Sequence, residues 1–379
     1  MKALPPSLEK KLQTRTNEGA LRSLPDALHL TDFASNDYLG LSKSTALHKT
    51  ADNLLSKRKF YGNGATGSRL ITGNHSLYRE AETAIAQFHN VESALIFNSG
   101  YDANIGFFSC VPQKNDVVLY DEFIHASIRD GLRLGNATAY KFKHNDLAAL
   151  EKSILQHREK AQELYIVTES VFSMDGDSPD LKQLTGIAAK YSCRIVIDEA
   201  HAVGIFGTNG EGLIQHIGLE DEVFARIVTF GKAMGCHGAA VLGVKELKEY
   251  LVNFARSLIY TTGLPPHALA KISAAYSVML QQAEARQTLF KNVTFFKAEA
   301  NRLHVSNLIP SDSAIQCVVI PGNEKVRHIA MQLQEQGYSI KPILSPTVPR
   351  GQERLRFCLH SYNTQDEISG ILYSLKAIL

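Results

Sequence analysis

The clearest pattern along the chain is a series of short apolar runs, rich in β-branched residues, that end in polar residues or glycine. Two of them occupy residues 195–197 and 227–228. Runs of this length and composition are typical of buried strands. Ligands of open parallel sheets bind beyond the carboxyl ends of the strands. We therefore expect one sheet edge to gather the polar residues that follow these two runs, which are Asp198, His201, Thr229 and Lys232.

The same alternation extends from about residue 90 to residue 240. Apolar runs at residues 93–97, 116–120 and 164–168 predict further strands, and the last of them leads into Glu169 and Ser173. Residues 75–89 have apolar positions at helical spacing. Strands that alternate with helices predict a mostly parallel sheet that is covered by helices on both faces.

The two ends of the chain have different patterns. Residues 7–22 predict an amphipathic helix, with Leu8 and Leu12 among basic residues, that lies across a neighbouring subunit. Residues 247–258 and 267–303 are helical in pattern. From residue 307, predicted strands at 315–320, 338–343 and 354–359 and helices at 326–336 and 366–379 indicate a small α+β domain. We expect an N-terminal helix and arm (1–45), a large domain (46–285) and a small C-terminal domain (286–379).

Composition excludes several classes of function. Forty basic and 38 acidic residues give a net charge of +2, which argues against a nucleic-acid or membrane partner bound by bulk charge. The five cysteines are scattered without a CxxC pair, so neither a disulfide framework nor a cysteine-based metal site is expected. The chain has neither a signal-peptide pattern nor an apolar run long enough to span a membrane. We expect a cytoplasmic protein without a metal.

Two loops are candidate ligand sites. Ser99, Gly100 and Tyr101 lie between a predicted strand and a helix start, where free N–H groups and the helix dipole favour a phosphate. His125 lies on another strand-to-helix connection and is either a ring that stacks on a flat heterocycle or an ordinary loop histidine. A GxGxxG pattern at residues 62–67 lacks a preceding strand, so it predicts a loop that approaches a ligand rather than a dinucleotide site.

An aspartate and a lysine at one sheet edge indicate a specific cofactor. A carboxylate can pair with a protonated pyridine nitrogen, and an amine can form a Schiff base with an aldehyde, as pyridoxal phosphate requires. Asp198 or Lys232 alone is more simply a solvated surface residue. Their occurrence together with His201 and Thr229 favours the cofactor site.

Arginines supply candidate sites for anionic substrates. Arg354 and Arg356 share one face of a predicted strand, where they either bind a carboxylate or are solvated on an edge strand. Arg22 at the end of the first predicted helix either meets an acidic ligand or is a solvated surface residue.

The chain resembles the α-oxoamine synthases, a family of pyridoxal-phosphate enzymes. The resemblance covers nearly the whole chain and is most specific in the sequences SNDYLGL (35–41), VFSMDG (171–176), DEAHAVG (198–204) and TFGKA (229–233). It implies an α/β fold of the aspartate-aminotransferase type (PLP fold type I), in which a large domain with a mostly parallel sheet is joined to a small α+β C-terminal domain. It also implies a homodimer with shared active sites.

The resemblance assigns roles to individual residues. Lys232 would hold the cofactor aldehyde and move the α-proton, Asp198 would pair with the pyridine nitrogen, and His125 would stack on the ring and meet substrate. Ser173 and His201 would lie near the phenolic oxygen. Gly100, Tyr101 and Thr229 would hold the cofactor around its phosphate.

The substrate residues would be Arg22, Asn36, Thr347 and Arg356, with Thr261 or Thr262 contributed from the partner chain. Leu344 stands where relatives often carry arginine, and Gly-Ala-Thr-Gly (64–67) is less glycine-rich than in many relatives.

The implied reaction is a decarboxylative condensation of an amino acid with an acyl thioester. The best match within the family joins L-alanine to a pimeloyl thioester, carried by CoA or by acyl-carrier protein, in biotin biosynthesis. Three alternatives remain open: a sister synthase that joins glycine or serine to another acyl-CoA, an aminotransferase, and a binding or scaffold protein without a cofactor.

Overall fold

The computed structural model describes residues 3–22, 24 and 29–379, and these form two compact units. The larger unit comprises Asn36–Ser173 and Ser178–Gln287. The smaller unit comprises the described residues up to Ser35, the short piece Met174–Asp177, and Thr288–Leu379. The helix α12 (Ala283–Arg302) begins in the larger unit and continues in the smaller one.

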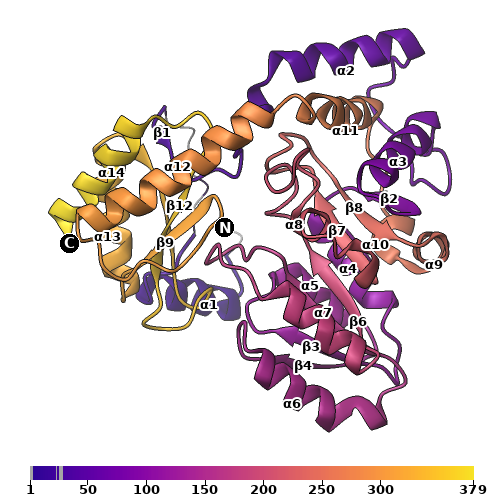
Figure 1. Ribbon diagram of the computed structural model, residues 1–379, viewed down its shortest axis with the longest axis horizontal. Coiled ribbons are helices and arrows are strands. Elements are labelled where there is room, and N and C mark those ends of the chain that lie inside the picture. Colours follow the sequence, from indigo (N-terminus) through magenta and orange to yellow (C-terminus); the bar gives the residue numbers. More distant parts are fainter. Residues whose placement is uncertain (1–2, 23, 25–28) are drawn as a thin grey trace. The chain divides into compact units, whose positions relative to one another are not determined.

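A seven-stranded sheet forms the centre of the larger unit, in the order β2-β8-β7-β6-β5-β3-β4 (Figure 1). Strands β3 to β7 are parallel to one another, whereas β8 is antiparallel to both of its neighbours. The mostly parallel sheet and its apolar-run strands are confirmed. The strands are β2 (Ser93–Phe97), β3 (Val117–Asp121), β4 (Thr138–Phe142), β5 (Leu164–Glu169), β6 (Arg194–Asp198), β7 (Ala225–Thr229) and β8 (Ala239–Gly243). The pattern missed β4, which is an edge strand with a largely exposed sequence, and β8.

The sheet is buried on both faces because its strands have apolar residues at successive positions. All six residues of β5 are buried. Tyr165 and Val167 belong to one hydrophobic cluster and Leu164 and Ile166 to the other. The first cluster includes residues of α4 (Gly100–Cys110), α5 (Ala126–Leu134), α9 (Lys245–Phe254) and α10 (Arg256–Ile259). The second includes residues of α6 (Leu147–His157), α7 (Leu181–Lys190) and α8 (Leu213–His216).

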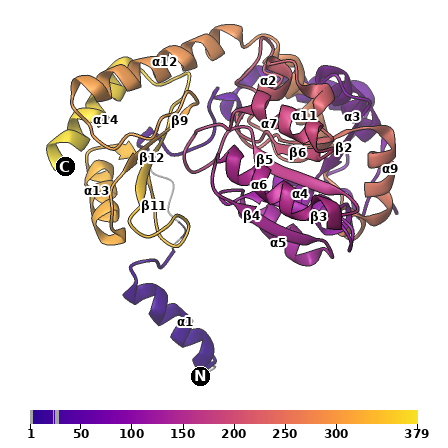
Figure 2. The ribbon, with the colours of Figure 1, turned by 60° about the horizontal axis from the view of Figure 1, so that its bottom comes forward.

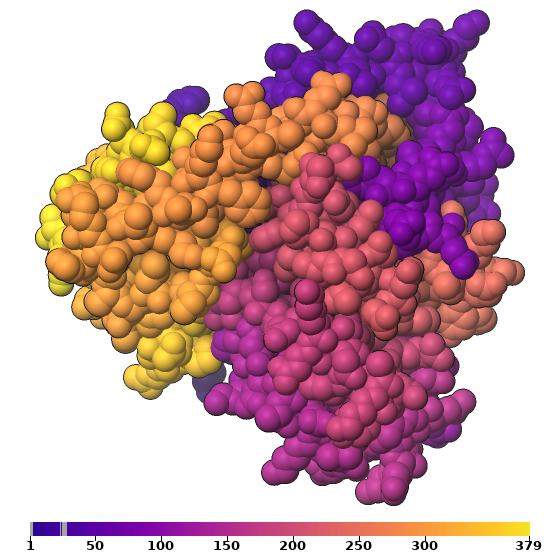
Figure 3. All heavy atoms as spheres, in the orientation of Figure 1, coloured from indigo at the N-terminus to yellow at the C-terminus, as the bar shows by residue number. Residues whose placement is uncertain are grey.

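The remaining helices of the larger unit lie beside this core. The predicted helix at 75–89 is confirmed as α3 (Ser76–Phe88). The helix α2 (Thr45–Arg58) packs on α11 (Pro266–Met279), and Figure 3 shows α2 in indigo on the surface. Two long predicted helical regions are each divided: residues 247–258 form α9 and α10, and residues 267–303 form α11 and α12.

A buried ion pair joins β7 to the segment that follows β6. Arg226 and Glu199 are both almost fully buried, and their Nη1 and Oε2 atoms are 3.5 Å apart. Arg226 also donates to the backbone oxygen of His89, while the second carboxylate oxygen of Glu199 accepts the N–H of Ile214 at 3.0 Å. Removing one partner of such a pair leaves the other as an uncompensated buried charge.

We therefore expect Arg226→Ala to destabilise the protein by about 3 kcal/mol or more, because Glu199 would remain buried without its cation. Urea denaturation followed by circular dichroism measures this change. The matched control is Arg194→Ala on the neighbouring strand β6, since Arg194 forms a half-exposed pair with Glu163. This variant should cost less than about 1 kcal/mol. Equal losses in the two variants would contradict the role of burial.

The smaller unit contains a three-stranded antiparallel sheet in the order β11-β12-β9. Figure 2 shows α12, α13 and α14 around its strands. The strands are β9 (Ile315–Val319), β11 (Lys341–Ile343) and β12 (Arg354–Cys358), and the helices are α13 (Asn323–Glu335) and α14 (Gln365–Ile378). The predicted strand at 338–343 is divided, because Tyr338–Ser339 forms β10 and pairs with β1 (Thr31–Asp32) instead. The small α+β arrangement agrees with the sequence pattern.

In this unit, the structure excludes one of the two alternatives given for Arg354 and corrects the bounds of the first helix. Arg354 is not a solvated residue of an edge strand, since β12 is the central strand of its sheet and Arg354 is buried in an ion pair with Asp175. The first helix, α1 (Pro6–Asn17), is shorter than residues 7–22, and all of its residues are exposed to solvent. Among the helices that the structure describes, none combines the length and apolar character that membrane crossing requires.

Candidate active site

A cavity of about 260 Å³ lies in the larger unit at the carboxyl ends of its parallel strands. The order of the strands in the sheet explains which residues line this cavity. Asp198 is the last residue of β6, Thr229 is the last of β7 and Glu169 is the last of β5. Because these strands are neighbours and parallel, their final residues reach the same sheet edge. The cavity is lined by ten residues that the sequence analysis singled out as cofactor or substrate residues: Asn36, Ser99, Gly100, Tyr101, His125, Ser173, Asp198, His201, Thr229 and Lys232.

The amine of Lys232 is held by a hydrogen-bonded chain. Its Nζ lies 2.7 Å from Nε2 of His201, and Nδ1 of the same ring lies 2.8 Å from the hydroxyl of Tyr38. The Tyr38 hydroxyl is also 3.1 Å from Oδ1 of Asn36. Sequence reasoning missed Tyr38 as a site residue, although it lies within the SNDYLGL sequence. The chain places an imidazole directly beside the amine, where the two groups can exchange a proton.

The carboxylate of Asp198 is oriented by two donors. Its Oδ1 accepts the N–H of Ala200 at 2.9 Å, and its Oδ2 accepts the side-chain amide of Asn104 at 3.0 Å. The same amide of Asn104 lies 2.9 Å from Oγ of Ser127, which lies 2.7 Å from Nδ1 of His125. Asn104 and Ser127 were not predicted. The available signal for Asn104 was a polar amide among the otherwise apolar positions on the inner face of α4, which the structure shows to be buried.

The charge state of His125 follows from its surroundings. Burial lowers the pKa of His125 below 6.5, and the positive charge of Lys232 acts in the same direction, whereas the carboxylate of Asp198 opposes the shift. The ring is therefore neutral at pH 7. A neutral imidazole at the N-terminus of α5 is suited to contact with the face of a flat ring.

One end of the cavity has the properties of an anion site. Ser99 is the N-cap of α4, and its Oγ accepts the N–H of Asp102 at 3.0 Å. The hydroxyl of Thr229 is buried and, within the described structure, has no hydrogen-bond partner. A Cβ atom at Gly100 would lie only 2.6 Å from Cγ2 of Thr229, so a side chain there would fill this end of the cavity. An unsatisfied hydroxyl beside a helix N-terminus fits the phosphate of pyridoxal phosphate.

The side chain of Tyr101 extends from the same helix. It is 45% exposed, and its hydroxyl donates to Oδ2 of Asp130 at 2.6 Å. This hydrogen bond and the charge of Asp130 raise the pKa of Tyr101. The phenol is therefore neutral and held by Asp130 at the cavity wall.

Three predicted substrate residues belong to the smaller unit. Arg22 and Thr347 line a cavity of about 160 Å³ in that unit. Arg356 lies on β12 and is partly buried. Their participation in the site stays a prediction. Thr261 and Thr262 bind Asn98 of the same chain, through Thr261 Oγ1 at 3.2 Å and the Thr262 carbonyl at 2.7 Å, and a role toward a partner chain stays a prediction as well.

The chain is similar in sequence to a known family and to known relatives. The sequence model of the family "Aminotransferase class I and II" matches residues 29–372. The chain is 39% identical, over 99% of its length and 95% of the relative, to 8-amino-7-oxononanoate synthase of Emericella nidulans.

Two solved structures have a similar fold. One is 8-amino-7-oxononanoate synthase from Francisella tularensis, with a TM-score of 0.78 and 30% identity over 92% of this chain and 97% of that one. The other is a serine palmitoyltransferase variant from S. paucimobilis with a bound aldimine of PLP and myriocin, with a TM-score of 0.89 and 25% identity over 98% and 96%.

The matched family, the fold and the cavity agree with one another. The fold is the aspartate-aminotransferase type of PLP enzymes. The cavity joins a lysine amine, an oriented carboxylate and a candidate anion site at a helix N-terminus, which are the groups that this cofactor needs. The chain belongs to the α-oxoamine synthase family within the class I and II aminotransferases, and it is an acyltransferase-type enzyme whose cofactor is pyridoxal phosphate.

Proposed function

We propose that the enzyme condenses L-alanine with a pimeloyl thioester, of CoA or of acyl-carrier protein, to give 8-amino-7-oxononanoate, carbon dioxide and the free thiol. This reaction would place it in biotin biosynthesis. Support for these substrates comes from 39% identity to the Emericella nidulans synthase over nearly the whole of both chains. Support for the chemistry comes from one observation, the placement of Lys232, Asp198 and Thr229 around a single cavity.

Each of these side chains has a part in the proposed reaction. Pyridoxal phosphate, when bound, supplies an electron sink for the negative charge that develops at the α-carbon of the amino acid. Asp198 accepts a hydrogen bond from the ring nitrogen and favours its protonated form. Lys232 would hold the cofactor aldehyde covalently, and its Nζ would accept the α-proton of the amino acid. His201, which contacts Nζ in the structure, orients the amine.

The other residues that the sequence singled out would hold the cofactor or the substrates. Thr229 and the N–H groups at the start of α4 bind the phosphate, since the hydroxyl of Thr229 has no other acceptor or donor in the described structure. His125 would cover one face of the ring, and Ser173 and His201 would lie near its phenolic oxygen.

The substrate residues are proposed from the family resemblance. Arg356 would bind the amino-acid carboxylate, while Arg22, Asn36 and Thr347 would contact the acyl substrate. The enzyme acts as a homodimer to which Thr261 or Thr262 of the partner chain contributes.

A second candidate keeps the mechanism and changes the substrates. Serine palmitoyltransferases are structural neighbours with a TM-score of 0.89 over 98% of this chain. This similarity favours, as the alternative, a synthase that joins serine or glycine to another acyl-CoA. The two candidates differ in the amino acid that they decarboxylate and in the acyl chain that they accept.

Carbon dioxide release from carboxyl-labelled amino acids distinguishes these candidates. We expect L-alanine with pimeloyl-CoA or pimeloyl-acyl-carrier protein to exceed serine or glycine with palmitoyl-CoA by about 100-fold in kcat/KM. A substrate that lacks complementary contacts in the site is disfavoured in kcat/KM by a factor of this order. Faster turnover of serine or glycine would establish the alternative. Accumulation of the pyridoxamine form without carbon dioxide would instead indicate an aminotransferase.

A further inference from the structure

A buried carboxylate in the cavity has no role in the reaction proposed above. Glu169 ends β5, is 3% exposed and lines the cavity. It stands in register with Asp198 on the neighbouring strand β6. Among the described residues, neither a lysine nor an arginine forms an ion pair with Glu169. A carboxylate that is buried in this way needs another source of stabilisation.

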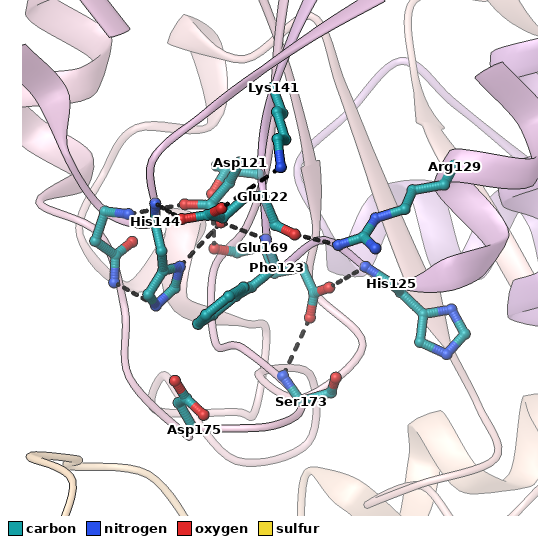
Figure 4. A network of polar contacts seen from close by, with 12 residues as sticks. Asp121, Glu122, Phe123, His125, Arg129, Lys141, His144, Glu169, Ser173 and Asp175 are labelled. Atoms are coloured by element: carbon teal, nitrogen blue, oxygen red, sulfur yellow. Dashed lines mark hydrogen bonds and ion pairs between the residues drawn. The ribbon is translucent and has the colours of Figure 1, made fainter. Parts of the chain in front are cut away.

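Backbone donors from two different loops supply that stabilisation. Oε1 of Glu169 accepts the N–H of His125 at 2.7 Å, and Oε2 accepts the N–H of Ser173 at 3.3 Å. Figure 4 shows Glu169 between these two residues, with a hydrogen bond to each. His125 lies on the connection after β3, and Ser173 lies on the connection after β5. One side chain thus ties together two loops whose residues line the cavity.

We propose that Glu169 is a positioning residue, which sets the places of His125 and Ser173 at the cofactor by accepting both backbone N–H groups when it is ionised. The proposal rests on the cofactor site of the proposed function. Two acceptor oxygens are essential to it. A glutamine at this position offers one acceptor and turns its NH₂ group toward an N–H donor, so that one of the two loops loses its bond.

The same geometry makes this positioning dependent on pH. Burial raises the pKa of Glu169 to about 8, and the negative charge of Asp198 adds to the rise, whereas Lys232 and the N–H groups of His125 and Ser173 oppose it. Below that pKa a proton occupies one carboxyl oxygen, and only the other oxygen remains a good acceptor. A cation held by Asp198 would offset the charge that disfavours ionisation of Glu169. Cofactor binding should therefore favour loss of the Glu169 proton.

The test compares pyridoxal phosphate affinity of wild type and Glu169→Gln across pH, by titration of the apoproteins. At about pH 6.5 both side chains offer one good acceptor, and the two dissociation constants should agree within about threefold. At about pH 9 the wild type has two acceptors, and the variant should bind about tenfold more weakly. Groups that titrate equally in both proteins change both dissociation constants by the same factor, so their effect cancels in the ratio of the two constants. A ratio that stays constant with pH would overturn the proposal.

Two further measurements complete the design. Hydrogen exchange of the apoproteins at about pH 8 should be about tenfold faster in Glu169→Gln for at least one of the two amides, that of His125 or that of Ser173, because one of the two N–H groups loses its acceptor. Unchanged exchange there would also overturn the proposal. If Glu169→Gln does not fold, wild-type protection factors decide, since protection of at least one of the two amides must increase as pH rises through about 8. Protection that is independent of pH would exclude the mechanism.

The matched control is Glu151→Gln. Glu151 lies on α6 and pairs with Lys190 at 2.8 Å on the surface, away from the cavity residues. It should leave both the affinity ratio and the exchange unchanged. The outcomes also separate this proposal from the proposed function. A wild-type protein that fails to bind pyridoxal phosphate would refute the cofactor site itself, whereas normal binding with a ratio independent of pH refutes only the role of Glu169.

Discussion

Replacing Lys232 with alanine is expected to reduce turnover by at least about 10³-fold, because the chain would lose both its covalent hold on the cofactor and the base for the α-proton. His201, whose Nε2 lies 2.7 Å from Nζ, cannot substitute, since an imidazole does not form a Schiff base with an aldehyde. The visible absorbance band of lysine-linked pyridoxal phosphate should also disappear. Steady-state carbon dioxide release and an absorbance spectrum measure the two effects.

Lys245→Ala is the control for this variant, because Lys245 is an exposed residue at the start of α9 and lies outside the cavity. It should retain both turnover and the absorbance band. Thermal melting should show that both variants remain folded, since the side chain of Lys232 enters a cavity rather than the hydrophobic core. Normal turnover by Lys232→Ala would contradict the proposed mechanism.

Replacing Asp198 with asparagine should lower kcat by about 100-fold. The substitution keeps the shape of the side chain and removes the negative charge that favours a protonated ring nitrogen. The donors from Ala200 and Asn104, at 2.9 and 3.0 Å, orient the carboxylate and cannot supply that charge. Cofactor affinity should fall as well, because an amide N–H₂ group would face Asn104 or the ring in place of an acceptor.

Asp180→Asn is the corresponding control. Asp180 caps the exposed N-terminus of α7, where asparagine caps a helix about as well as aspartate does. Rates should be measured with the cofactor in excess, so that weakened binding and slowed chemistry are separated. A kcat for Asp198→Asn that lies within twofold of wild type would show that the ring nitrogen does not depend on this charge.

The sequence predicted those features of the site that depend on local pattern. The residues after each apolar run end their strands in a common direction, so Asp198, Thr229 and Lys232 could be assigned to one edge before any coordinates were known. The start of α4 at Gly100 followed from a strand, a turn of small residues and a helical pattern. The edge strand β4 was missed because residues 138–142 lack an apolar run, and their neighbours in the sheet come from elsewhere in the chain.

Side-chain partners that are distant in sequence could not be predicted in this way. The contacts of Tyr38 with His201 and of Asn104 with Asp198 join residues 163 and 94 positions apart. Whether Arg354 is solvated or buried depended on the position of β12 within its sheet, which spacing along one strand does not reveal.

The sequence by itself determined most of the buried parallel strands, the family resemblance, and the amine and the carboxylate that the chemistry requires. Only the tertiary structure decided which groups surround them: the His201–Tyr38 chain behind Lys232, the Asn104 amide on Asp198, and Glu169 between two loops. The physical reason is that alternation of apolar and polar residues records burial along one element. Hydrogen-bond partners and pKa shifts depend instead on distances between elements, which are set when the sheet assembles.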